Sequence, residues 1–221
     1  MLIAIDGPAA SGKGTLARRL ASHFSLPYLD TGILYRAVAH HLIEDHISLE
    51  DVQAAQKVAE NLCLDGPTVR GEDPALLRGR TIGEAASIVA SYPEVRAALL
   101  SKQRLFSSRP GGAILDGRDI GTVICPYADL KLFITASLEE RARRRTLELL
   151  ARGESIPFDA ILADLQRRDT RDFSRKTAPL QCAPDAFIID TSLLSEEAAF
   201  AYAREHAETL LHAPASEPLP S

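Results

Sequence analysis

Three glycines and one lysine fall within nine residues of this chain, in the stretch GPAASGKGT at positions 7–15. The apolar run at residues 2–5 predicts a buried strand before the stretch, and apolar side chains at helical spacing over residues 16–24 predict a helix after it. A glycine-rich turn between a strand and a helix points backbone N–H groups and the positive end of the helix at one place. The stretch therefore predicts an anion-binding site.

The segment GPAASGK fits the pattern G-x-x-x-x-G-K of phosphate-binding loops. This match predicts that Lys13 bridges the outer phosphates of a nucleoside triphosphate, and the alternative is a tight turn that binds no ligand. The general pattern has Ser or Thr directly after the lysine, whereas Gly14 intervenes here, which leaves Thr15 as one candidate contact for magnesium. A GTPase switch is disfavoured because the 221 residues contain no guanine-selecting [NT]KxD segment.

Composition excludes several classes of protein. A chain of 221 residues that is 46% hydrophobic and 25% charged fits one globular domain with elaborations. Its net charge of -5 disfavours binding to nucleic acid or anionic lipid. We see no apolar run of the ~20 residues that a membrane helix needs, no secretion signal and no CxxC pair among the three cysteines. A cytoplasmic location is expected.

Arginine outnumbers lysine 20 to 5, and nine arginines lie between positions 141 and 175. Arginine is the better residue for two-point contact with phosphate. Acidic residues are interspersed in the same stretch, so a solvated helical face is the alternative explanation on composition alone.

The order of predicted elements indicates an α/β fold. Strands at 2–5, 26–32, 113–117, 129–136 and 186–192 alternate with helices, which predicts a parallel sheet covered on both faces. Ser48 with Asp51 and Ser137 with Glu140 have the spacing of capping boxes, and Ser195 opens a last helix that reaches about residue 212. Residues 63–69 read as a small hairpin, and 213–221 as a frayed tail.

Four further segments show a family resemblance: DTGILYR (30–36), AASIVASYPEVRAALLSKQR (85–104), ILDGRDIGTV (114–123) and RDTRDFSRKTAPL (168–180). With GKGT they resemble the bacterial cytidylate kinases from residue 2 to about 211. The resemblance implies a P-loop NTPase three-layer sandwich with a core of 1–30, 106–151 and 177–212, an NMP-binding insertion at 31–105 and a short lid at 152–176. It also implies a monomer that moves the γ-phosphoryl group of ATP, bound with Mg²⁺, to CMP or dCMP.

The resemblance assigns residues to the two substrates. The ATP-binding residues are Gly7, Pro8, Ala9, Ala10, Ser11, Gly12, Lys13, Gly14 and Thr15, to which Arg144 is added from the helix before the lid. Arg141 and Arg145 are its alternatives for touching ATP, and all three could equally belong to a solvated face. The catalytic residues are Lys13, Arg36, Arg118 and Arg168, and Arg171 is a further candidate for holding phosphates.

The CMP-binding residues implied by the resemblance are Thr31, Arg36, Ser87, Arg96, Arg118, Asp119, Arg168, Asp172 and Arg175. Asp119 matches an aspartate that contacts cytosine, and a carboxylate accepts from the N4 amino group of cytosine but repels O4 of uracil. Ser87 and Arg96 match the other base contacts, and Asp172 and Arg175 lie near the sugar. Asp6 is expected to be structural rather than catalytic.

Two alternatives stay open from the sequence. One is a kinase for another monophosphate, such as UMP. The other is a regulator that binds ATP and transfers nothing, although no extra interaction domain is visible in the sequence. Neither alternative changes the predicted fold.

Overall fold

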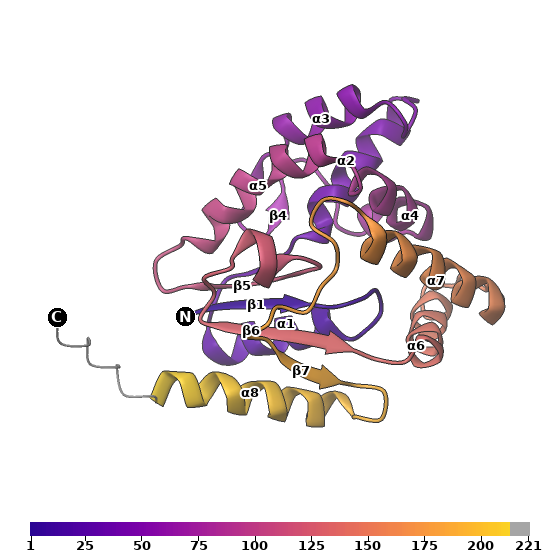
Figure 1. The fold of residues 1–221 in the computed structure, drawn as a ribbon. Helices are drawn as coiled ribbons and strands as arrows, with labels where there is room; N and C mark the ends of the chain where they lie inside the picture. Colours follow the sequence, from indigo (N-terminus) through magenta and orange to yellow (C-terminus); the bar gives the residue numbers. More distant parts are fainter. Residues whose placement is uncertain (213–221) are drawn as a thin grey trace.

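A computed structural model gives the fold of this chain and describes residues 1–212 (Figure 1). The predicted frayed tail, 213–221, lies outside the described residues. Five strands form one parallel sheet in the order β2-β5-β1-β6-β7. They are β1 (Leu2–Asp6), β2 (Tyr28–Asp30), β5 (Ala113–Gly117), β6 (Leu130–Thr135) and β7 (Phe187–Asp190). The predicted parallel sheet is confirmed.

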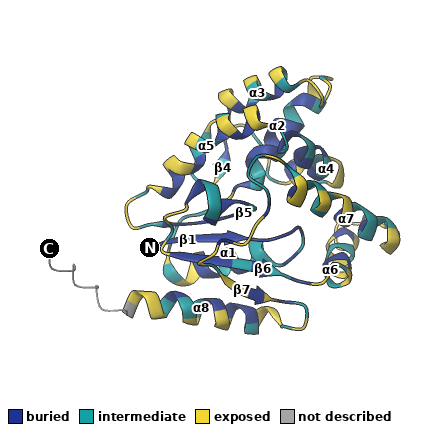
Figure 2. Cartoon of the chain, viewed as in Figure 1, coloured by how far each residue is buried: buried dark blue, intermediate teal, exposed yellow. Residues whose placement is uncertain are grey.

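Helices cover both faces of the sheet, and β1 and β5 are therefore buried throughout (Figure 2). Ile3 and Ile5 pack with α1 (Lys13–Phe24) and α8 (Glu196–His212) on one face. Leu2 and Ala4 point to the other face, where α5 (Pro93–Ser107) and a π-helical turn (Ile120–Ile124) cover them. Full burial of one such isoleucine or leucine stabilises the fold by about 1.5–3 kcal/mol. None of the described helices combines the length and apolar character needed to cross a membrane.

The segment between β2 and β5 forms its own hydrophobic cluster above the sheet (Figure 1). It contains α2 (Gly32–Glu44), α3 (Val52–Asn61), a 3-10 turn (Leu76–Arg78), α4 (Arg80–Val89) and α5. The predicted hairpin is present as β3 (Leu64–Asp65) paired antiparallel with β4 (Thr68–Val69).

Two of the three predicted helix caps are confirmed. Ser137 accepts from the backbone N–H of Glu140 at 3.2 Å, and Ser195 accepts from that of Ala198 at 3.1 Å. The prediction of Ser48 as a cap is wrong, because residues 48–51 close a turn and α3 begins only after it. Asp51 is the cap instead, and its carboxylate accepts from the N–H of Ala54 at 2.9 Å.

A pair of packed helices stands at the carboxyl end of the sheet. α6 (Leu138–Leu150) and α7 (Phe158–Ser174) are joined by a loop, as the sequence predicts. Their contact buries Ala142, Leu149, Ile161 and Leu165, and Ala9 of the glycine-rich loop belongs to the same cluster. Figure 1 shows α7 reaching back towards α4, with which it is in contact.

Asp6 fixes the chain that follows β5. Its two carboxylate oxygens accept from the backbone N–H groups of Ile120 at 2.8 Å and Gly121 at 2.7 Å. Burial raises the pKa of Asp6 to about 6, although the two N–H donors oppose that change. Its expected structural role is supported, because this contact sets the position of the DGRD segment relative to the glycine-rich loop.

Replacing Asp6 should destabilise the fold. In the variant Asp6→Asn the amide nitrogen faces a backbone N–H, so we expect the free energy of unfolding at pH 7 to fall by about 1–3 kcal/mol. Urea denaturation measures the change. The exposed Asp45 supplies the control, since Asp45→Asn should shift stability by no more than about 0.5 kcal/mol. Equal stability of the two variants would contradict the anchoring role.

Candidate active site

The glycine-rich loop joins β1 to α1 in a conformation that depends on its glycines. A β-carbon on Gly7 would lie 2.0 Å from the carbonyl oxygen of Ile134, so no side chain fits there. Gly12 has φ +89° directly before α1, where glycine is favoured. Lys13 is the first residue of α1, and its ammonium group donates to the carbonyl of Pro8 at 3.4 Å. The loop therefore wraps around the positive end of α1.

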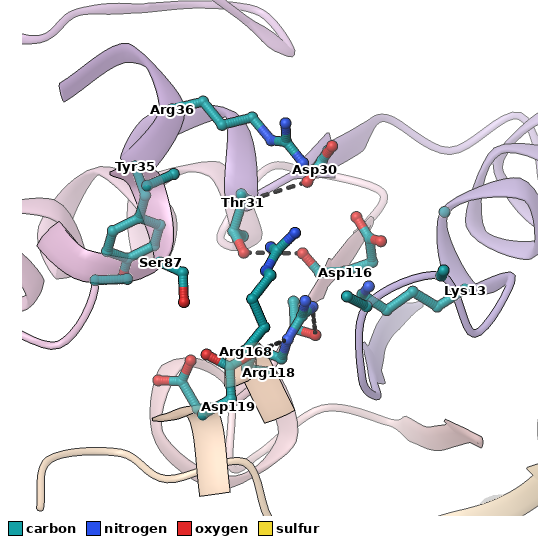
Figure 3. Close-up of a pocket in the computed structure, with 18 of the residues that line it drawn as sticks. Lys13, Asp30, Thr31, Tyr35, Arg36, Ser87, Asp116, Arg118, Asp119 and Arg168 are labelled. Atoms are coloured by element: carbon teal, nitrogen blue, oxygen red, sulfur yellow. Dashed lines mark hydrogen bonds and ion pairs between the residues drawn. The ribbon is translucent and has the colours of Figure 1, made fainter. Parts of the chain in front are cut away.

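A cavity of about 270 Å³ opens beside this loop. Figure 3 shows Lys13 at one side of it, Arg118 and Arg168 near its middle, and Ser87 and Asp119 on the opposite side. The structure brings together every predicted CMP-side residue, from segments up to 144 positions apart (31 to 175). They are Thr31, Arg36, Ser87, Arg96, Arg118, Asp119, Arg168, Asp172 and Arg175.

Two arginines that form no ion pair within residues 1–212, Arg36 and Arg168, lie in the middle of the cavity, where Arg36 donates to the carbonyl of Leu77 at 3.1 Å. The NH1 nitrogens of Arg36 and Arg168 lie 3.4 and 3.8 Å from the point where Gly83 would carry a β-carbon, so this glycine gives both side chains room. The buried Nε of Arg168 has no hydrogen-bond partner among residues 1–212. Burial, followed by the charges of Arg118 and Arg36, lowers the pKa of Arg168. An anion bound here would relieve that repulsion.

Arg118 differs from the other two because a carboxylate holds it. Its Nε donates to Asp172 at 2.8 Å, and its NH1 donates to the carbonyl of Gly117 at 3.1 Å. Burial alone would raise the pKa of Asp172, but the charges of Arg118 and then Arg168 outweigh burial and lower it. Asp172 thus fixes the direction in which Arg118 faces the cavity.

The far end of the cavity contains a buried polar cluster. Asp119 accepts from Arg96 at 2.5 Å and lies 3.6 Å from Arg175. Arg96 also donates to the carbonyl of Ala90 at 3.2 Å and stands 5.4 Å from the ring centroid of Tyr35. An aromatic ring beside fixed donors and a carboxylate acceptor suits a flat, polar ring such as a nucleobase.

Sequence reasoning missed Tyr35 and two carboxylates, Asp30 and Asp116, at the ends of the adjacent strands β2 and β5. Tyr28 donates its hydroxyl to Asp116 at 3.0 Å. Burial and then the charge of Asp30 raise the pKa of Asp116 to about 7. The positions of Asp30 and Asp116 in the sequence could have revealed them, because aspartates at the ends of neighbouring parallel strands meet at one edge of the sheet.

Thr31 and Thr15 lie on different sides of the site. Thr31 is buried, and its hydroxyl donates to the carbonyl of Asp116 at 2.8 Å, so only its oxygen lone pairs face a ligand. Thr15 accepts weakly from Arg18 at 3.3 Å. It lines a separate space on the outer side of the glycine-rich loop.

That separate space is a cavity of about 280 Å³ between α1, α6 and the chain after β7. Arg144 donates to the carbonyls of Ser11 at 3.3 Å and Thr191 at 2.6 Å. Leu16, Leu194 and Ala199 supply an apolar wall. The predicted ATP contact Arg144 is thus placed next to the loop, in a cavity that could hold a second planar base.

The neighbours of Arg144 have other partners. Arg141 is buried, donates to the carbonyls of Ala136 at 3.0 Å and Ala9 at 3.3 Å, and pairs with Asp169 at 2.6 Å. Arg145 pairs with Glu148 at 2.7 Å on the edge of the first cavity. The solvated-face explanation is wrong for Arg141, because it links the glycine-rich loop to α7.

Comparison with known proteins identifies the family. The family described as "Cytidylate kinase" matches this chain over residues 3–208. The chain belongs to the cytidylate kinase family. It is 60% identical over 200 residues to the cytidylate kinase of Methylocella silvestris, an alignment that covers 90% of each chain. It is 53% identical over 204 residues to that of Brucella suis, covering 92% of this chain and 91% of the relative.

A solved structure also resembles this member of the cytidylate kinase family. It is an uncharacterized protein from Eubacterium ventriosum with a TM-score of 0.54 and 13% sequence identity, and the match covers 95% of this chain and 99% of that one. This likeness supports the fold alone. The family resemblance and the α/β fold expected from the sequence are both confirmed.

The titration of Lys13 should depend on Asp116. Burial and then the nearby charge of Arg118 lower the pKa of Lys13 to about 8, while the carboxylate of Asp116 opposes them. In Asp116→Asn the pKa of Lys13 should fall further, towards neutral pH, because the opposing negative charge is lost. Carbon-13 NMR of labelled lysines measures this, and the exposed Lys176 provides the internal control. A pKa of Lys13 that rises or stays constant would refute the coupling.

Proposed function

We propose that this chain transfers the γ-phosphoryl group of ATP to CMP or dCMP, which yields ADP and CDP or dCDP. Family membership supports the reaction class. The observation that carries the assignment to this site is one cavity with the loop lysine at one side, uncompensated arginines in the middle and the Asp119–Arg96 pair at the far end. That order matches the triphosphate of the donor, the phosphate of the acceptor and the acceptor base.

The main barrier to this reaction is repulsion between two polyanions. A unit pair at ~4 Å costs about 4 kcal/mol at an effective dielectric of ~20. Lys13, Arg36, Arg118 and Arg168 offset this repulsion and stabilise the phosphoryl group in transfer. The acceptor phosphate is already an oxyanion, so no general base is needed. This agrees with a cavity in which no histidine stands among the lining residues.

Base selection rests on Asp119. Its carboxylate accepts from the N4 amino group of cytosine, whereas O4 of uracil would face it with a second acceptor. Arg96 holds the carboxylate in place and donates to O2 or N3 of the base, and Ser87 lies beside them. Asp172 and Arg175 face the sugar, where the 2′-hydroxyl is the only difference between CMP and dCMP.

The donor nucleotide lies along the glycine-rich loop, and its adenine end reaches the second cavity. Residues 7–15 hold its phosphates, and Arg144 lies against the adenine end. Magnesium accompanies ATP and neutralises part of the phosphate charge when it is bound. Asp116 and Asp30 fit this hard cation, because their carboxylates lie side by side at the ends of β5 and β2, where burial and then the charge of Asp30 raise the pKa of Asp116. Thr15, on the outer side of the loop, is the alternative contact predicted from the sequence. Within residues 1–212 no three His, Cys, Asp or Glu side chains form a metal cage, so phosphate oxygens supply the other ligands.

The proposed reaction divides the chain into three functional parts. Residues 31–105 form the NMP-binding insertion and 152–176 the lid, on a core of 1–30, 106–151 and 177–212. Closure of the lid excludes water, so that ATP is spent on the acceptor. A monomer in the cytoplasm remains our expectation for this enzyme.

An acceptor panel tests the function. ADP formation should depend on CMP or dCMP, and UMP and AMP should support it much less well. Turnover without any acceptor dependence would favour an ATP-binding regulator, and a tenfold preference for UMP would refute the role of Asp119.

In Asp119→Asn the ratio of kcat/KM for CMP over UMP should fall by about 10- to 100-fold, since an amide can donate to O4 of uracil. The exposed Asp159, changed to Asn, is the control.

Arg168 should act on the transfer step. We expect Arg168→Ala to lower kcat by about 10³-fold, while KM for ATP changes little because the donor lies across the loop. Steady-state kinetics with both substrates varied measures the two effects separately. Arg143→Ala removes an exposed guanidinium from α6 and serves as the control. An unchanged kcat in Arg168→Ala would remove this residue from the mechanism.

A further inference from the structure

Three side chains of α7 reach across to α4, and Arg167 is one of them, 3.8 Å from Glu84. Asp164 accepts from Arg80 at 2.6 Å at the exposed end of the contact. Further along α7, Arg171 donates its NH1 to the hydroxyl of Ser87 at 2.8 Å. Ser87 is buried and lines the cavity at the proposed base end. The bond from Arg171 therefore reaches a residue of the substrate site, although Arg171 is not itself among the residues that line the cavity.

The hydroxyl of Ser87 is used differently from the hydroxyls of three helical threonines. Thr146, Thr170 and Thr209 each donate to the carbonyl one turn earlier, at 2.8 to 3.0 Å. Among residues 1–212, Ser87 has no such bond, and its hydroxyl group bonds only to Arg171. A serine hydroxyl has one hydrogen and two lone pairs. Arg171 occupies one lone pair, which leaves the hydrogen and the second lone pair for a ligand.

Arg171 faces the hydroxyl of Ser87 and not a carboxylate. Two nearby arginines pair with acids instead: Arg167 with Asp164, and Arg118 with Asp172. Within residues 1–212, Arg171 forms no ion pair, so its positive charge is directed at the oxygen of Ser87. Hydrogen bonds from a charged donor are stronger and more directional than neutral ones. This bond therefore holds the Ser87 side chain in one rotamer.

We infer that Arg171 is a positioning residue for the acceptor base and acts through Ser87. The inference rests on the proposed function, in which Ser87 contacts cytosine. It differs from the sequence-based expectation that Arg171 holds phosphates. Because Arg171 lies on α7 and Ser87 on α4, the base site is complete only when the lid helix packs against the insertion. Recognition of the base is thereby tied to closure.

A double-mutant cycle tests this inference. The ratio of kcat/KM for CMP over UMP is measured for wild type, Arg171→Ala, Ser87→Ala and the double variant. We expect Arg171→Ala to lower the ratio about tenfold, the loss typical of one charged hydrogen bond. The double variant should have the same ratio as Ser87→Ala, since Arg171 has no route to the base without the hydroxyl.

The controls separate positioning from packing. Arg167→Ala removes an α7 arginine that pairs with Asp164 and Glu84 and not with Ser87, and it should keep the wild-type ratio. Arg171→Met keeps most of the side-chain stem and lacks the donor, so it replaces Arg171→Ala if that variant does not fold. A ratio within twofold of wild type in the Arg171 variants, or losses that multiply in the double variant, would overturn the inference. Wild type without CMP-dependent turnover would instead defeat the proposed function.

Discussion

Repulsion among buried guanidinium groups is the interaction on which the rest of the structure depends. Arg36 and Arg168 meet at Gly83, and burial, followed by the charges of Arg118 and Arg36, lowers the pKa of Arg168 and makes its charged form less stable than that of a free arginine. A fold can keep such charges only where other contacts outweigh them. Here the hydrophobic clusters of the sheet, of the insertion and of α6 with α7 surround the cavity and hold its walls together. The unfavourable charge is then available to attract phosphate.

The cavity has an electrostatic direction. At the base end, Asp119 pairs with Arg96 and lies near Arg175, and Asp172 pairs with Arg118 beside it. In the middle, Arg36 and Arg168 form no ion pair with the described carboxylates. A nucleoside monophosphate entering this cavity has one favourable orientation, with its phosphate at the uncompensated arginines and its neutral base at the paired cluster. Long-range charge thus orients the substrate before hydrogen bonds are made.

Much of this arrangement can be predicted from sequence where one local pattern decides it. The strand, the glycine-rich loop and the helix are contiguous, so the pattern at residues 2–24 specifies them together. Contacts between distant segments are harder to predict. Asp30 and Asp116 are 86 positions apart in the chain and form one site only because β2 pairs with β5. Gly83 looks like an ordinary helical glycine until two arginines are seen beside it. Ser48 fits a capping box, but the turn at residues 48–51 displaces the cap to Asp51.

The bond between Asp6 and the turn after β5 constrains how chains of this kind can diverge. Two N–H groups on consecutive residues meet two oxygens of one carboxylate. Adding or removing a single residue between Gly117 and Ile120 would turn Arg118 or Asp119 away from the cavity. The insertion has a hydrophobic cluster of its own, and its surface turns can absorb extra residues without moving that carboxylate. Length differences among related chains should therefore accumulate in the insertion, while the stretch after β5 changes only by substitution.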